Sequence, residues 1–222
     1  DFDFKGHKTL GDWQAALGIN LRCPHLSWFT MEGEAKRDYP ASIHYQSPWF
    51  REYKTVEDYF GRLNAMLSRG REIRDILVIH PIESLWGNKE ILKPGKNLKI
   101  LTPFEKEFVC LRNLLLESHI DFDYGDEDII GRHGSIVFRD GEPRFKVAEA
   151  EYKAVVIPSS MTTIRGGTIS LLKKFREETG CVVFANEPPK HLDGIPSEEP
   201  ANLAKECLMA KNNSSRIIEF LG

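Results

Sequence analysis

The segment from His25 to Trp49 carries the residue types in this chain that are best suited to chemistry. Its sequence, HLSWFTMEGEAKRDYPASIHYQSPW, combines aromatic side chains with His, Arg and Asp and lacks the regular spacing of a helix or a strand. A pyranose ring offers an apolar face to aromatic side chains and a rim of hydroxyl groups to polar ones. The segment is therefore typical of a sugar-binding loop. The alternative is a buried loop that closes one end of a domain.

Carboxyl groups are a second kind of chemistry that this segment offers. Most glycoside hydrolases hold two carboxyl groups on either side of the scissile bond, one protonated and one ionised. The segment contains Glu32, Glu34 and Asp38. Glu32 and Glu34 are close neighbours in a polar stretch, and a solvated loop explains them more simply. The residues alone therefore assign no catalytic pair.

The composition of the 222-residue chain is that of an ordinary globular protein, with 41% hydrophobic residues, 28% charged residues and a net charge of −3. Lys and Arg are scattered along the chain and create no basic field for a phosphate backbone, so we expect no nucleic-acid partner. No stretch is apolar for long enough to span a bilayer, so we expect no membrane partner.

The four cysteines, Cys23, Cys110, Cys181 and Cys207, are far apart in the sequence. No Cys-x-x-Cys pair and no His at metal-ligand spacing accompanies them, so we expect no metal site. Cys110 and Cys181 have apolar neighbours, which favours buried and unreactive thiols.

Residues 1–70 are expected to form a helix, a strand and a second helix. A short helix over His7–Leu17 ends at Gly18, and the apolar sequence INLRCPHLSWF that follows predicts a strand leading into the sugar-binding loop. After Pro48, apolar side chains recur every three or four positions, which predicts an amphipathic helix that ends at Gly70. That apolar face is more typical of a core than of a ligand site.

From residue 71 onward, short apolar runs alternate with helical segments. Strands are predicted at ILVIHPI, IDFDYG, YKAVVIP, CVVFAN and RIIEFLG, helices at 104–118, 126–131, 168–178 and 198–211, and a hairpin in SIVFRDGEPRFKV that turns at Asp140-Gly141. This alternation predicts an α/β fold with a doubly wound parallel sheet of flavodoxin-like type over residues 71–222. We therefore expect a domain boundary near residue 70.

Ligands of such sheets bind outside the carboxyl ends of the strands. The candidates there, by position alone, are the polar and aromatic side chains His80, Glu83, Trp86, Asp123, Tyr124, Ser159, Ser160 and Glu187. Each of them can equally be a helix cap or a polar group of a loop.

Two more specific chemistries can be compared with these loops. A catalytic Cys would need a sharp Gly-flanked turn between a strand and a helix, whereas Cys181 begins its predicted strand and Cys110 lies within a helix. The backbone N–H groups of Gly166, Gly167 and Thr168 could hold a phosphate or a flavin, but their spacing matches no nucleotide-binding motif. A plain helix start with Thr168 as N-cap is the simpler interpretation, and we expect no cofactor.

Three stretches together resemble a known family. They are PHLSWFTMEGEAKRDYPASIHYQSPWFREYKTVEDYFGRLNAMLSRGREIRDILVIHPIESLW, SHIDFDYGDEDII and YKAVVIPSSMTTI. The chain resembles large bacterial glycoside hydrolases of the α-L-rhamnosidase kind, close to family 106. The resemblance implies that residues 1–70 are the last helix, strand and helix of a (β/α)₈ barrel. It also implies that residues 71–222 are a flavodoxin-like domain akin to the trimerisation domain of certain β-galactosidases.

The resemblance also implies a site. Active sites of such barrels lie at the carboxyl ends of the strands, which is where His25, Trp28 and the segment Arg37-Asp38-Tyr39 would shape a substrate pocket. Trp28 would stack on a sugar ring, His25 would hydrogen-bond a hydroxyl group, and Arg37 or Asp38 would hold neighbouring hydroxyl groups. The catalytic carboxylates of the family are expected on earlier barrel strands, before Asp1.

The function expected from the sequence is therefore the C-terminal portion of a carbohydrate-active glycoside hydrolase. It would contribute pocket residues and a non-catalytic flavodoxin-like domain, in a periplasmic or secreted protein. These 222 residues alone would be inactive. The first alternative is a stand-alone flavodoxin-like module that binds a ligand or forms a homo-oligomer. The second is a flavodoxin-like enzyme that uses the loops at the strand ends.

Overall fold

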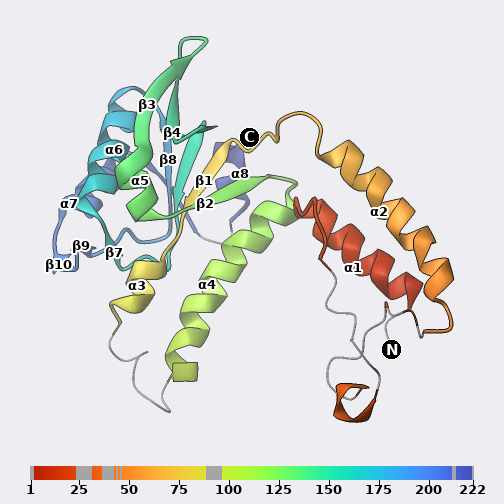
Figure 1. Ribbon diagram of the computed structural model, residues 1–222. Coiled ribbons are helices and arrows are strands. Elements are labelled where there is room, and N and C mark those ends of the chain that lie inside the picture. The colour runs from red at the N-terminus through yellow and green to blue at the C-terminus, as the bar shows by residue number, and fades with distance from the viewer. Residues whose placement is uncertain are drawn as a thin grey trace. The chain divides into compact units, whose positions relative to one another are not determined.

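The structure is a computed structural model that describes residues 3–23, 32–36, 43, 45, 47–88, 97–211 and 214–221, with the side chains of 35–36 and 97–102 excepted. The chain divides into two compact units, Asp1–Glu72 and Ile73–Gly222. Figure 1 shows their elements coloured along the chain.

The described part of the first unit is helical. It contains α1 (Phe4–Ala16), the 3₁₀ helices η1 (Gly33–Lys36) and η2 (Phe50–Tyr53), and α2 (Lys54–Leu67). Asp3 caps α1 by accepting a hydrogen bond from the backbone N–H of Gly6 at 2.7 Å. The two predicted helices are thus confirmed. Residues 19–23, the described part of the strand predicted after α1, are not in a strand.

The core of the second unit is a five-stranded parallel sheet. Its strands are β1 (Ile76–Ile79), β2 (Phe122–Gly125), β6 (Ala154–Ile157), β8 (Cys181–Ala185) and β11 (Leu208–Ala210). They are ordered β11-β8-β6-β1-β2, and every neighbouring pair is parallel. Numbered along the chain, this order is the 2-1-3-4-5 arrangement of flavodoxin-like folds. The predicted fold class is therefore confirmed.

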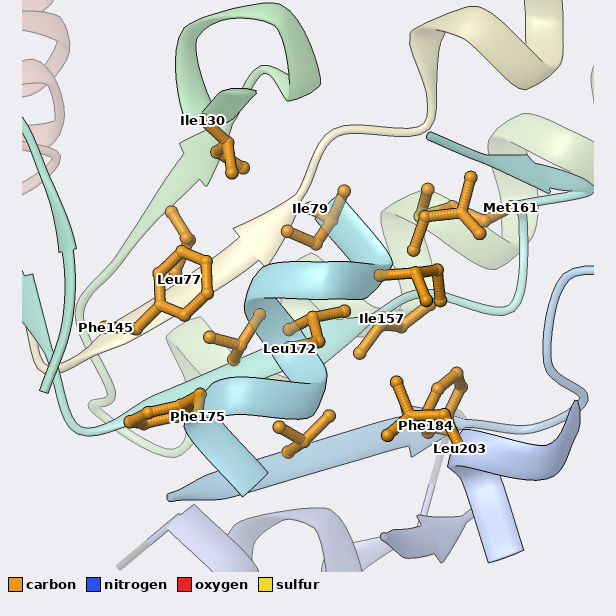
Figure 2. Packing of buried hydrophobic residues seen from close by; sticks show 14 of the residues in the cluster. Leu77, Ile79, Ile130, Phe145, Ile157, Met161, Leu172, Phe175, Phe184 and Leu203 are labelled. Carbon is orange, nitrogen blue, oxygen red and sulfur yellow. The ribbon is translucent and has the colours of Figure 1, made fainter. Parts of the chain in front are cut away.

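Helices cover both faces of this sheet, which explains the continuous apolar runs of its strands. On one face, Leu111 and Leu115 of α4 (Asn97–Glu117) and Ile217 of α8 (Ser215–Leu221) pack against the strands. The other face is covered by α5 (Glu127–His133), α6 (Gly166–Glu177) and α7 (Glu199–Lys205). Figure 2 shows Leu172 and Phe175 of α6 directed at the strands of this second face.

The remaining elements are small additions to the sheet. A meander of β3 (Gly134–Arg139), β4 (Glu142–Val147) and β5 (Ala150–Tyr152) precedes β6; α3 (Ile82–Trp86) follows β1; and β7 (Thr163–Ile164), β9 (His191–Leu192) and β10 (Ile195–Pro196) form a third sheet. The hairpin between β3 and β4 turns at Asp140 and Gly141, as predicted. Both residues have positive φ, 52° and 83°, which is the conformation of a type I′ turn.

Two predictions about the end of the chain are wrong. In the described part of the predicted closing strand, RIIEFL lies in the helix α8, and the helix predicted over 198–211 is split into α7 and the strand β11. In the apolar run of α8, Ile217 faces the core and the Ser214 hydroxyl accepts a hydrogen bond from the N–H of Arg216 at 3.2 Å. A serine that caps the first turn of a helix can favour helix over strand in a short apolar run, even where the residues have high β propensity.

Candidate functional site

The residues predicted to bind sugar lie outside the described residues. This applies to all five of them: His25, Trp28, Arg37, Asp38 and Tyr39. The candidate site that the structure does describe is the edge of the sheet at the carboxyl ends of its strands, where the second group of residues was predicted. Asp123 and Tyr124 of that group lie within β2 rather than after it.

An ion-pair network crosses this edge beside α3. The guanidinium of Arg165 donates to both carboxylate oxygens of Glu83, at 2.5–3.0 Å, and to Asp128 at 3.2 Å. Bidentate pairs of this kind fix both partners. Glu83 is therefore engaged by the protein itself. Sequence reasoning missed Arg165, and no local signal marks it, because it lies 82 residues from Glu83.

The start of α6 is already occupied by carboxylates. Glu127, which is 2% exposed, accepts a hydrogen bond from the N–H of Arg165 at 2.9 Å, and Asp193 accepts one from the N–H of Gly166 at 3.1 Å. Burial raises the pKa of the Glu127 carboxyl, and the bond from Arg165 opposes that shift. The arrangement opposes a phosphate at this helix start, because two carboxyl groups of the protein already lie there and accept from the N–H groups of Arg165 and Gly166.

Thr168 is not the N-cap of α6. The N-cap is Arg165, and Thr168 lies fully buried in the first turn of the helix. The prediction was wrong because the helix begins at the two glycines rather than after them. Their helical conformation was not evident from the sequence.

Ser84 holds the loop that follows β6. Its hydroxyl accepts hydrogen bonds from the N–H groups of Thr162 and Thr163, at 2.9 and 3.1 Å, and donates to the carbonyl of Thr163 at 3.2 Å. Beside it lies a cavity of about 400 Å³ that is lined by Ser84, Gly87, Asn88, Thr162, Thr163, His191 and Gly194. This cavity lies by the ends of β1 and β6, between which the strand order reverses.

His80 belongs to a cluster of rings at the end of β1. Its ring centroid lies 5.5 Å from that of Phe108 and 5.7 Å from that of Tyr124, and the rings of Phe108 and Tyr124 are 4.9 Å apart. Burial raises the pKa of the Tyr124 hydroxyl. A second cavity, of about 380 Å³, opens between α3 and α4 and is lined by His80, Pro81, Ile82, Leu85, Phe104, Glu105 and Phe108.

The other predicted edge residues, apart from Ser160, have structural partners or face solvent. Ser160 is buried, and its hydroxyl has no hydrogen-bond partner among the described residues. Asp123 lies within β2 and binds Arg74 at 2.8 Å and the hydroxyl of Tyr152 at 3.0 Å. Ser159 donates to Glu107 at 2.9 Å. The buried Ser160, the exposed Glu187 and Trp86, which is 63% exposed, complete the set.

Metal and thiol chemistry find little support in the described ranges. Within them, no three His, Cys, Asp or Glu side chains are grouped so as to hold a metal ion. Burial raises the pKa of the Cys207 thiol to about 11 and also raises that of Cys181. Both thiols are therefore protonated and unreactive near neutral pH.

No helix in the described part of the chain is long and apolar enough to cross a membrane. Comparison of the whole sequence with models of protein families and with curated proteins found no match.

Proposed function

We propose that this chain is the C-terminal part of a carbohydrate-active glycoside hydrolase. In it, residues 1–70 contribute side chains to the substrate pocket, and the flavodoxin-like unit has no catalytic role. The family resemblance of the sequence supports the carbohydrate assignment. The observation that carries the non-catalytic role is the neutralised edge of the sheet.

That edge is where flavodoxin-like folds place their ligands. Here Glu83 is held by Arg165, and Glu127 and Asp193 fill the start of α6. Carboxyl groups that are already held by an arginine or by backbone N–H groups are poor acids, bases and phosphate ligands, since a reaction would first have to break their contacts. This is what a supporting module requires.

A stand-alone binding module is the second candidate. It is favoured by the compactness of Ile73–Gly222, which has its own apolar clusters on both faces of the sheet. Such a module would bind its ligand without residues 1–70 and without hydrolysing glycosides.

Turnover by the product of the native reading frame separates the two candidates. We expect that product to hydrolyse an aryl glycoside such as p-nitrophenyl α-L-rhamnopyranoside. Trp28→Ala and His25→Ala should each lower kcat/KM about tenfold or more, because both would remove contacts that position the sugar.

Matched controls come from exposed residues of the same types. Trp13 is 61% exposed on α1 and His133 is exposed at the end of α5, so Trp13→Ala and His133→Ala should leave kcat/KM unchanged. Absence of hydrolysis across a panel of aryl glycosides, or unchanged kinetics in both pocket variants, would reject the proposal.

A further inference from the structure

The cavity between α3 and α4 has side chains suited to a ligand that the proposed function does not use. We propose that it is a non-catalytic binding site for a single pyranose ring. The cavity belongs wholly to the second unit, and its volume of about 380 Å³ lies at the lower end of the range for ligand cavities. In Figure 1, α3 directly follows β1, and the end of α4 that the chain reaches first lies on the same side of the sheet as α3.

The aromatic wall of the cavity is fixed in place. Phe104 and Phe108 lie one turn apart on α4 and so share a face of the helix. Phe108 is held by its ring contacts with His80 and Tyr124, at 5.5 and 4.9 Å. A ring surface that is already ordered binds the apolar face of a sugar without a further loss of side-chain freedom.

The polar groups of the cavity are available, unlike the other polar groups at this edge. Glu83, Ser84 and Ser159 are bound to other parts of the protein. Neither the Glu105 carboxylate nor a ring nitrogen of His80 is hydrogen-bonded to any residue that the structure describes. The carboxylate can accept two hydroxyl hydrogens, and the imidazole supplies one donor and one acceptor when neutral.

This set of groups favours a sugar over a cation. An ammonium ion would also suit aromatic rings and a carboxylate, but it has no acceptor for the imidazole N–H, and Pro81, Ile82 and Leu85 make part of the wall aliphatic. A pyranose presents vicinal hydroxyls to Glu105 and His80 together with C–H groups for the apolar wall.

The site would bind without cleaving. Of the described residues, Glu105 is the one carboxylate that lines the cavity, whereas most glycoside hydrolases use two.

Titration of the whole chain with methyl pyranosides tests the inference. The probes are methyl α-L-rhamnopyranoside, methyl β-D-galactopyranoside and methyl β-D-glucopyranoside, followed by ¹H–¹⁵N NMR. At least one should shift the amide signals of α3 and of the Phe104–Phe108 turn, with a Kd in the millimolar range typical of so small a ligand. Glu105→Gln should weaken this binding about tenfold, because bonds to an ionised acceptor are the stronger ones.

Glu117→Gln is the matched control, since Glu117 is equally exposed on α4 and does not line the cavity. It should bind like the parent. Absence of shifts with all three probes overturns the inference, as does equal binding by the Glu105→Gln variant. Binding of tetramethylammonium that depends on Glu105, with no sugar binding, would assign the cavity to a cation instead.

The two proposals fail separately. Shifts confined to residues 25–39 would support the barrel pocket and reject this cavity. Shifts confined to α3 and α4, without aryl glycoside hydrolysis by the native protein, would leave a binding module with no catalytic partner.

Discussion

The Ser84 hydroxyl ties the helix after β1 to the loop after β6. It is 3% exposed and accepts hydrogen bonds from two backbone N–H groups, those of Thr162 and Thr163. Ser84→Ala should lower the free energy of unfolding by about 2 kcal/mol, because it leaves both donors without this acceptor. Urea unfolding of the chain measures the loss.

Ser170→Ala is the control for this variant. Ser170 is exposed on α6, and its hydroxyl donates to a carbonyl of its own helix, so its removal should change stability by no more than about 0.5 kcal/mol. Equal stability of the two variants would show that the Ser84 bonds add nothing to the fold.

Glu127 gives the second unit a pH dependence of defined sign. Burial raises the pKa of its carboxyl in the folded protein above the ordinary value of 4.5. The folded protein therefore holds this proton to higher pH than the unfolded chain does. Stability contributed by this group is then present at low pH and is lost as pH rises from 4.5 through the raised pKa.

Glu127→Gln should remove this loss, because the amide stays neutral and its oxygen still accepts from the N–H of Arg165. Relative to the parent, the variant should gain stability in urea unfolding as pH rises above 4.5. Glu178→Gln, at an exposed position that ends α6, should show no such gain. If the free energy of unfolding of Glu127→Gln instead fell relative to that of the parent as pH rises, the raised pKa of Glu127 would be contradicted.

The partners of Ser84 and Glu83 also show which residues of the candidate site were unpredictable. The order of residues along the sequence predicted that polar side chains follow the strands, and His80, Glu83 and Ser159 do lie at the sheet edge. The hydrogen-bond partners of Glu83, Ser84 and Ser159 come from elements about 50–80 residues away in the chain, and single-sequence spacing carries no information about such pairs. The cavity residue Glu105 was missed because the sequence does not show that α4 lies beside the segment after β1.

At the scale of elements, α6 ends in a Schellman motif with an unusual residue. The N–H of Gly180 donates to the carbonyl of Phe175 at 2.8 Å and that of Thr179 to Arg176 at 2.9 Å, and Thr179 has a φ of 69°. A β-branched residue is strained there. Thr179→Gly should therefore raise the free energy of unfolding by about 1 kcal/mol.

Substitution of the neighbouring Gly180 should instead lower the free energy of unfolding. A Cβ atom at Gly180 would lie 2.4 Å from the ring of Phe175, which is fully buried. Gly180→Ala should therefore cost about 2 kcal/mol through overpacking. Thermal or urea unfolding of the two single variants measures both effects. Destabilisation by both would show that the left-handed residue is not strained.

Elements were predictable where local rules agree. The runs ILVI, AVVI and CVVFA are buried strands, Asp126 caps α5, and Asp140-Gly141 forms the hairpin turn. The failures in the second unit include β11, with only three residues, and α8, whose apolar positions suit both a strand and a helix. In such short segments, packing on the finished sheet decides the structure.

At the scale of the whole molecule, the two units differ in how much they bury. The second unit has apolar clusters on both faces of its sheet, whereas the described residues of the first show one cluster, built on Tyr53, Val56 and Phe60. A domain of about 150 residues buries roughly 70% of the surface that its unfolded chain exposes, while one half that size is marginal.

Residues 73–222 expressed alone should therefore fold. We expect one cooperative urea transition, dispersed NMR amide signals and sugar-dependent shifts in α3 and α4 like those of the whole chain, because every contact of the sheet edge described above lies within this unit. Residues 1–72 alone should unfold without a cooperative transition, since their described cluster is too small to offset the loss of chain entropy. A non-cooperative transition for 73–222 would mean that its fold depends on the first unit, and the flavodoxin-like unit would then be no independent module.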